Sequence, residues 1–311
     1  MPRILRILCL LCVLAVVFTA PAPAQAAPTA GPPAVRVVIL GTGTPNADPE
    51  RSGPSVAVVV GDEAYLFDAG PGIVRRAAAA KKESIEALDS PNLKRVFLTH
   101  LHSDHTLGLP DLIFSPWVLD RTEPLEVYGP SGTAAMVGHL EAAYVEDVRM
   151  RLYGLEPANV TGYRAMAHEI EPGVVYRDEL VTIEAIPVEH GSWPVAFGYK
   201  VSAGGVSVVL SGDTRPSEAL VAAARGCDIL LHEVYSQAGF DRREPEWQRY
   251  HAAFHTSTRE LAEIARRVRP QVLVLYHQLF WGVSDDDLVT EVHDAGYGGV
   301  VVSAKDLAVF P

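Results

Sequence analysis

Short runs of apolar residues recur along most of the chain, separated by turns rich in glycine, proline, aspartate and asparagine. Runs that are rich in valine, isoleucine, leucine and phenylalanine, with such turns on either side, are typical of buried β-strands. The pattern predicts strands over residues 34–40, 56–60, 65–67, 95–98, 125–128, 181–188, 195–201, 206–210, 229–231, 272–276 and 300–302.

Longer stretches between these strands have the three-to-four-residue apolar spacing of helices. A turn at residues 68–72 opens the first helix, which continues to about Lys82. Closely spaced strand pairs, together with strand–helix alternation, favour an α/β (α+β) protein with two sheets and helices outside them. The remaining helices are expected over residues 109–119, 133–149, 216–224, 258–268 and 285–293.

The domain organisation follows from where linkers occur. No linker-like composition follows Pro33, so we interpret residues 34–311 as one domain. Residues 152–177 have weak periodicity and scattered glycines. Long irregular segments in compact domains are often functional, so both an active-site lid and a plain surface connection stay open for this stretch.

The first 33 residues differ in composition from the rest. Two arginines precede an apolar run over residues 7–20, and a small-x-small pattern ends at Ala26. This indicates a signal peptide over residues 1–26, followed by a Pro/Ala/Gly linker over 27–33. The apolar run is shorter than the ~20 residues that a membrane-spanning helix needs. We therefore expect a periplasmic or secreted protein with no stable membrane anchor after cleavage.

The charge balance is acidic, with 38 Asp and Glu against 26 Lys and Arg and a formal net charge of −12. Nucleic-acid-binding proteins usually present a basic surface, because contacts to the phosphate backbone dominate their affinity. This balance argues against a large nucleic acid as a partner and favours a small-molecule substrate. Of the three cysteines, only Cys227 lies outside the apolar start of the chain, so the exported protein would have no internal disulfide.

Residues 99–106, THLHSDHT, gather four metal-type side chains in a short stretch. His100 and His102 alternate, as they do where an extended chain points every second side chain the same way. Asp104 and His105 follow where the chain turns into the next helix, so they can point toward a neighbouring position. Zinc is bound by imidazole nitrogen and carboxylate oxygen, usually by four ligands. The pattern therefore predicts ligands for two adjacent ions.

Three further candidate ligands, His190, Asp213 and His277, each lie just past an apolar run. An isolated histidine is more often structural than a ligand. Loops at the carboxyl ends of strands can converge on one edge of a sheet, however, and these three residues repeat one placement. We therefore expect them to join the cluster at residues 99–106.

These residues resemble the metallo-β-lactamase fold superfamily. The resemblance rests on LFDAG at residues 66–70, THLHSDH at 99–105, SGDT at 211–214, His190 and His277. Three further segments resemble the ribonuclease Z and arylsulfatase-like branch: GTGTP at 41–45, LHEVY at 231–235 and AFHTS at 253–257.

The resemblance implies a four-layer αββα sandwich of two mixed sheets, with helices on both outer faces and a dinuclear zinc site along one edge. It also implies two groups of ligands and a bridging carboxylate. These are His100, His102 and His190 for one zinc ion, Asp104, His105 and His277 for the second, and Asp213 between them.

The resemblance gives four side chains a supporting or catalytic role. Asp68 would orient a ligand, and Glu233 would support His255 near the scissile group. A histidine held by a carboxylate stays protonated more readily, so it can stabilise an anionic transition state or protonate a leaving oxygen. Two zinc ions can also lower the pKa of a shared water and supply hydroxide near neutral pH. Asp104 is then the best candidate for orienting that water or accepting its proton.

Two features of the expected site stay open. A histidine–aspartate site also tolerates manganese or iron in place of zinc. Trp193, Phe280 and Trp281 lie close to ligands in the sequence and are candidates for apolar walls around a small substrate, with plain packing as the alternative.

We interpret the chain as an exported dinuclear zinc hydrolase in which metal-bound hydroxide attacks a small anionic ester, an arylsulfate or a phosphodiester. Ribonuclease Z carries a Gly/Pro-rich arm between its third histidine and bridging aspartate, and residues 190–213 leave no room for one. Transfer-RNA maturation is therefore disfavoured. The alternatives are a lactonase or other acyl hydrolase of the same fold, a ribonuclease Z-like endoribonuclease, and a non-catalytic zinc-binding protein. The oligomeric state, including a homodimer, stays open.

Overall fold

The computed structural model describes residues 34–311, which belong to one compact unit. The signal peptide predicted over residues 1–26 and the linker over 27–33 lie outside the described residues. Both stay predictions, and so does the periplasmic or secreted location. None of the helices within residues 34–311 is long and apolar enough to cross a membrane.

Two seven-stranded sheets form the centre of this unit, and each contains parallel and antiparallel pairs. The first sheet has the order β14 (Val309–Phe310), β1 (Val35–Gly41), β2 (Ser55–Val60), β3 (Glu63–Phe67), β4 (Arg95–Phe97), β5 (Leu125–Gly129) and β6 (Ala165–Glu169). The second has the order β13 (Val300–Ser303), β12 (Val272–Leu279), β11 (Ile229–Tyr235), β10 (Val206–Leu210), β9 (Ala196–Ala203), β8 (Val181–Val188) and β7 (Gly173–Arg177).

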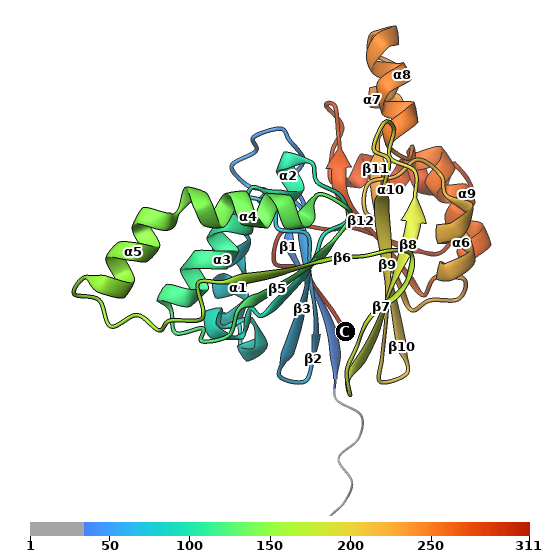
Figure 1. The fold of residues 1–311 in the computed structure, drawn as a ribbon. Coiled ribbons are helices and arrows are strands. Elements are labelled where there is room, and N and C mark those ends of the chain that lie inside the picture. The colour runs from blue at the N-terminus through green and yellow to red at the C-terminus, as the bar shows by residue number, and fades with distance from the viewer. Residues whose placement is uncertain (1–33) are drawn as a thin grey trace, which may run out of the picture. The chain divides into compact units, whose positions relative to one another are not determined.

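Helices cover the outer faces of the two sheets (Figure 1). Beside the first sheet lie α1 (Ile73–Lys82), α3 (Leu109–Val118), α4 (Thr133–Ala143) and α5 (Val145–Tyr153), with the 3-10 turns η1 (Glu86–Leu88) and η2 (Ser90–Asn92). Beside the second lie α6 (Glu218–Ala224), α9 (Thr258–Val268) and α10 (Asp285–Asp294). The remaining helices are α2 (Ser103–Thr106), α7 (Gln237–Phe240) and α8 (Pro245–Phe254). The arrangement confirms the predicted four-layer αββα sandwich.

Alternate residues of one strand serve two different cores, which explains why the strands read as continuous apolar runs. In β1, Val37 and Ile39 belong to the core between the two sheets, whereas Val38 and Leu40 belong to the core under α1 and α3. Successive side chains of a strand point to opposite faces, and both faces are covered here. A third core joins the second sheet to α6, α9 and α10.

The segment 152–177 connects the two sheets and contributes one strand to each. It contains β6 and β7, which lie at the edges of the first and the second sheet, and so it carries the chain from one sheet to the other. Edge strands are covered on fewer sides, and both strands have half-buried and exposed residues only. Their weak periodicity follows from this partial burial. Of the two alternatives left open for this segment, its place in the two sheets favours the surface connection.

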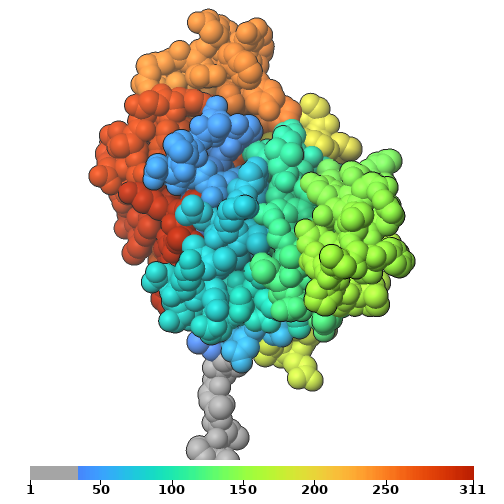
Figure 2. All heavy atoms as spheres, turned by 90° about the vertical axis from the view of Figure 1, so that its left-hand side faces the viewer, coloured from blue at the N-terminus to red at the C-terminus, as the bar shows by residue number. Residues whose placement is uncertain are grey.

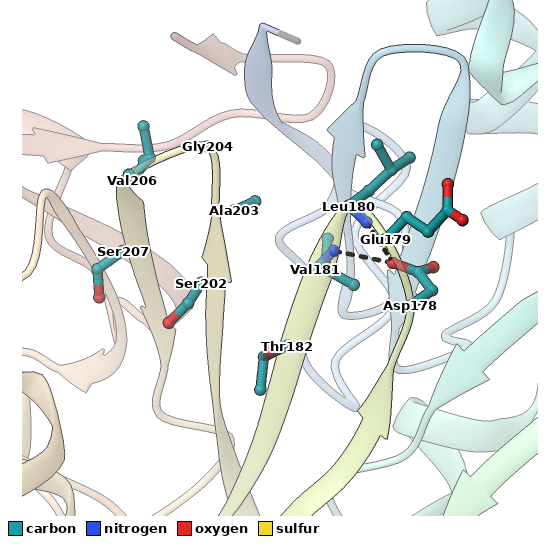
Figure 3. Close-up of a pocket in the computed structure, with 11 residues that line it drawn as sticks. Asp178, Glu179, Leu180, Val181, Thr182, Ser202, Ala203, Gly204, Val206 and Ser207 are labelled. Atoms are coloured by element: carbon teal, nitrogen blue, oxygen red, sulfur yellow. Dashed lines mark hydrogen bonds between the residues drawn. The ribbon is translucent and has the colours of Figure 1, made fainter. Parts of the chain in front are cut away.

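Asp178 joins the two sheets at the end from which β8 starts. It lies in the turn between β7 and β8, where it accepts hydrogen bonds from the backbone N–H groups of Leu180 and Val181, each 2.8 Å long (Figure 3). Its carboxylate also accepts a 2.6 Å hydrogen bond from the hydroxyl of Tyr65 on β3 and a 3.0 Å one from Tyr176 on β7. These hydrogen bonds hold the turn and the two sheets together. The full length of β8 separates Asp178 from His190.

Candidate metal centre

The chemistry-bearing loops meet at one edge of the sandwich. Asp68 follows β3 and His100 follows β4 in the first sheet, while His190 follows β8 and Asp213 follows β10 in the second. Figure 1 shows α2, which carries Asp104 and His105, at this same end, opposite the hairpin between β2 and β3. The topology thus brings together side chains that are far apart in sequence, as expected for the carboxyl ends of neighbouring parallel strands.

Three imidazole nitrogens from the first predicted group point at one another. His102 Nδ1 lies 2.9 Å from His100 Nε2 and 3.1 Å from His190 Nε2. The far nitrogens have other partners, because His190 Nδ1 donates to the carbonyl of Phe254 at 2.8 Å and His100 Nδ1 donates to the hydroxyl of Thr99 at 2.9 Å. Those contacts fix the tautomers, so that the near nitrogens of His100 and His190 keep their lone pairs. Only a proton or a metal ion between the three nitrogens satisfies them.

The protonation of these histidines suits metal binding. Burial lowers the pKa of His100 well below its ordinary value and lowers the pKa of His190 to about 4. Both rings are therefore neutral near pH 7, and a neutral imidazole is the form that binds a metal ion.

Asp104, His105 and His277 form the second group. Asp104 Oδ2 lies 3.5 Å from His105 Nε2 and 3.3 Å from His277 Nε2. His105 Nδ1 donates a 2.8 Å hydrogen bond to Asp68, which turns Nε2 toward the group. Asp68 also accepts from the hydroxyl of Thr99, the same hydroxyl that accepts from His100. One carboxylate thus orients a candidate ligand in each group.

Asp213 stands between the two groups. Its Oδ2 atom lies 3.4 Å from His105 Nε2, 3.4 Å from His277 Nε2 and 4.0 Å from His190 Nε2. Gly212 lets the chain reach this position, because its φ is +60° and a Cβ there would lie 2.5 Å from the carbonyl oxygen of Phe197. The geometry is that of a carboxylate able to bridge two ions.

The second group carries more negative charge than its own hydrogen bonds neutralise. Burial disfavours the charged form of His105, but Asp213 and Asp68 outweigh it and raise the pKa of this histidine well above its ordinary value. Several buried atoms have no hydrogen-bond partner within residues 34–311, among them His105 Nε2, Asp213 Oδ1 and His277 Nδ1. The site therefore favours positive charge, and its histidine–aspartate clusters can bind metal ions.

A β-bulge directs His277 toward the site. Glu233 of β11 pairs with Tyr276 of β12, and Val234 then pairs with Gln278, so His277 is the extra residue. Its φ of +47° is rare for a residue with a side chain. A bulge re-aims one side chain without moving the rest of a strand. His277 can therefore face Asp104 and Asp213, although regular pairing of β11 and β12 continues on both sides of it.

Glu233 and His255 lie beside the second group. Glu233 Oε1 accepts a 2.8 Å hydrogen bond from the backbone N–H of Thr256, and its Oε2 lies 3.4 Å from His255 Nδ1. His255 is also 3.9 Å from Asp213 Oδ2 and lines a cavity of about 500 Å³. The structure thus brings all ten predicted site residues to one place, while their individual roles stay predictions.

The cavity has a polar floor and an aromatic side. In Figure 2, the blue atoms of the loop after β1 lie below the orange atoms of α7 and α8, and Asn46 and Trp247 from these two segments both line the cavity. Trp281 lines it as well. Phe280 instead packs under the guanidinium of Arg51, and Trp193 donates a hydrogen bond to His102 Nε2 at 2.8 Å. Sequence reasoning missed the lining residues on and before α8, which are Arg243, Trp247 and Tyr250.

Known proteins share this sequence and fold. Residues 63–278 match the beta-lactamase superfamily domain. A Ribonuclease Z of Mycobacterium sp. (strain KMS) is 35% identical over 247 residues, covering 79% of this chain and 84% of that protein. A Ribonuclease Z of Mycolicibacterium gilvum (strain PYR-GCK) is 32% identical over 246 residues, covering 78% and 84%. The crystal structure of human tRNase Z, short form, has a TM-score of 0.67 at 22% identity and covers 89% of this chain and 98% of that one.

These relatives correct two expectations. The small anionic ester as substrate is wrong, and so is the exclusion of a large nucleic acid as partner, because relatives above 30% identity over most of both chains are ribonucleases by name. Net charge failed as a guide because it sums over the whole surface, whereas a phosphodiester meets only the local field of a metal site. The lack of a Gly/Pro-rich arm between His190 and Asp213 does not affect the residues of the metal centre. The chain belongs to the beta-lactamase superfamily, in the branch that contains ribonuclease Z.

Proposed function

We propose that the protein is a metal-dependent endoribonuclease of the ribonuclease Z type, which hydrolyses a phosphodiester bond in RNA. One observation carries the proposal: Asp213 lies between two groups of buried ligands, within 3.4 Å of His105 and His277 and 4.0 Å of His190. A carboxylate in this position could bridge two metal ions, and two-metal sites are used for phosphoryl transfer. The similarity to curated ribonucleases Z supplies the substrate class.

Zinc is the metal that we propose, because five histidines and two aspartates supply the nitrogen and oxygen donors that it prefers. When bound, the two ions would lower the pKa of a water and neutralise negative charge on the phosphate. Asp104 would contribute a carboxylate oxygen that orients this water or accepts its proton. Asp68 keeps His105 in place through the 2.8 Å hydrogen bond to Nδ1.

His255 is the proposed donor of a proton to the departing ribose oxygen. An alkoxide is a poor leaving group, so protonation in the transition state accelerates its departure. His255 lines the cavity and sits 3.4 Å from the Glu233 carboxyl group. Burial lowers the pKa of His255 to about 4, contrary to the expectation of a ring that stays protonated, so the ring would take up its proton only as the anionic phosphate binds beside it. The backbone N–H of Thr256 holds the carboxyl group of Glu233 at 2.8 Å, so the pair is positioned before substrate arrives.

The test is cleavage of end-labelled RNA by the purified, metal-analysed protein. A transfer-RNA precursor with a 3′ extension serves as substrate, beside the His100→Ala variant and the exposed-site control Asp286→Asn. We expect cleavage at one position that is lost on chelation and in His100→Ala, restored by zinc and unchanged in the control. Metal-loaded protein that leaves RNA intact would refute the proposal. Cleavage that persists in His100→Ala would come from a contaminant and would refute it too.

The export signal is a separate proposal. Sequencing the N-terminus of the protein recovered from outside the cytoplasm would test it, with a start after Ala26 as the expected result. Recovery of an intact N-terminus only from the cytoplasm would reject it.

A further inference from the structure

One side of the cavity above the metal centre is aromatic and basic, and none of its residues belongs to the two ligand groups. Trp247 and Tyr250 lie on α8, Arg243 lies between α7 and α8, and Trp281 lies just after β12. We call these four residues the aromatic wall. It lines the same cavity as Asp104, Asp213 and His277.

The rings of the aromatic wall are held in place and yet are open to water. Trp247 is 45% exposed and Tyr250 is 38% exposed. The ring of Tyr250 stacks on Phe254 with centroids 4.3 Å apart, and that of Trp247 lies nearly parallel to His251 at 5.9 Å. Aromatic surface in contact with water is unfavourable, and covering it with an apolar ligand would lower the free energy. A flat apolar ligand, such as a nucleobase, would cover it by stacking.

Arg243 adds an unneutralised charge to the same wall. Its guanidinium carbon lies 5.2 Å from the ring centroid of Trp281 and 5.7 Å from that of Trp247. Within residues 34–311 the Nε atom of Arg243 is buried without a hydrogen-bond partner, although acidic residues outnumber basic ones in this chain. A guanidinium with free donors beside a phosphodiester centre matches a phosphate oxygen in charge and geometry.

The depth of the metal centre restricts what can reach it. The candidate ligands His100, His105, Asp213 and His277 are all at most 2% exposed, and the cavity measures about 500 Å³. That volume suits a nucleotide-sized ligand. In an RNA double helix the bases are paired and stacked on one another, so a base can stack on the aromatic wall only where the strand is single.

We propose that the aromatic wall binds an unpaired nucleotide beside the cleaved phosphate, with its base on Trp247 and Tyr250 and its own phosphate at Arg243. The inference rests on the proposed endoribonuclease function and narrows the substrate to RNA that is single-stranded at the cleavage position. The wall confers no choice of base sequence, because stacking accepts every base.

Binding can be measured apart from cleavage. The probe is a fluorescein-labelled single-stranded RNA pentanucleotide with phosphorothioate linkages, which resist hydrolysis, and the readout is fluorescence anisotropy with the metal-loaded full chain. Trp247→Ala and Arg243→Ala should each raise the Kd about 10-fold. Trp247→Phe should restore most of the affinity, whereas Arg243→Lys should restore only part, because it keeps the charge but loses the forked donors. The same strand within a duplex should bind more weakly and respond to neither variant.

Two control variants separate the wall from general charge and aromatic content. Arg249→Ala removes an exposed arginine from the same helix outside the cavity, and Tyr153→Ala removes an 84% exposed ring from α5. Both should leave the Kd unchanged. The proposal is overturned by wild-type protein that does not bind the probe at millimolar concentration, by an unchanged Kd in Trp247→Ala, or by equal losses in the controls.

The outcomes also separate this inference from the proposed function. Protein that binds the probe through the wall but cleaves no RNA would refute the endoribonuclease and keep the wall as a nucleotide site. Protein that cleaves RNA with the same KM in Trp247→Ala would refute the wall and keep the endoribonuclease.

Discussion

His105 donates a hydrogen bond of 2.8 Å from its Nδ1 to the carboxylate of Asp68, and both side chains are buried. The bond fixes the ring so that Nε2 faces Asp104 and Asp213. We expect Asp68→Asn to weaken zinc binding about 10- to 100-fold, because an amide is a weaker acceptor and holds the ligand less firmly. Competition with a chromogenic chelator measures this. Asp286→Asn should bind zinc as the wild type does, and an equal affinity in both variants would contradict the role of Asp68.

Asp213 and His277 should differ in how much metal their loss removes. Asp213 contacts both groups, whereas His277 belongs to the second group alone. We expect His277→Ala to keep one metal ion on the three histidines of the first group, and Asp213→Ala to lose most of both. Elemental analysis after dialysis, with circular dichroism as the check on folding, gives the ratio. Equal metal content in the two variants would argue against a bridging carboxylate.

The contribution of His255 should depend on the leaving group. A ribose alkoxide needs a proton, while p-nitrophenolate leaves readily without one. We expect His255→Ala to lower kcat for RNA about 100-fold or more and to lower the rate on bis-p-nitrophenyl phosphate far less. Glu233→Gln should act in the same direction, because it replaces the carboxyl group that positions His255 Nδ1. Equal losses on both substrates would show that His255 holds metal or structure instead of a proton.

Tyr65 and Asp178 supply a stability test at the opposite end of the sandwich. Burial raises the pKa of Asp178, but hydrogen bonds from Tyr65 and the backbone N–H of Val181 outweigh it and hold the pKa below its ordinary value. Tyr65→Phe should therefore lower the free energy of unfolding by about 1 kcal/mol at neutral pH. Tyr163→Phe, on a ring that packs against Trp117, is the matched control.

The same pair predicts a pH dependence. A carboxylate whose pKa is lowered by folding contributes stability above its unfolded pKa and loses that contribution as the pH falls through its folded pKa. The difference between wild type and Tyr65→Phe should thus be full near neutrality and shrink in acid. Urea denaturation at several pH values measures it, and a difference independent of pH would mean that the tyrosine acts through packing alone.

The sequence predicts the parts of this protein that depend on local pattern. Strands such as β1 and β8 are recognisable because burial on both faces demands continuous apolar residues. The cluster of His100, His102, Asp104 and His105 is recognisable because one short loop carries all four. Where burial is partial, as in β6 and β7, the pattern fades and the prediction fails.

Other features depend on how distant segments meet, which local pattern does not report. Helix α8 mixes charged and aromatic residues without a continuous apolar stripe, and only His251 is buried in it. Trp247 and Trp281 become neighbours of the metal centre through the path of the chain, not through sequence spacing. The expectation of no nucleic-acid partner failed for a similar reason, because a total charge of −12 does not report where the arginines lie on the surface.

The bulge at His277 makes this ligand independent of the strand that carries it. In a regular ladder, inserting or deleting one residue exchanges the two faces of everything beyond the change. Here the extra residue is the candidate ligand itself. Deleting His277 would leave β11 and β12 regularly paired, and it would remove one of the three candidate ligands of the second group. An attempt to transplant this centre onto another sheet would have to carry the irregular backbone along with the imidazole. Alignments built on strand alternation alone would place the histidine one position away from where it acts.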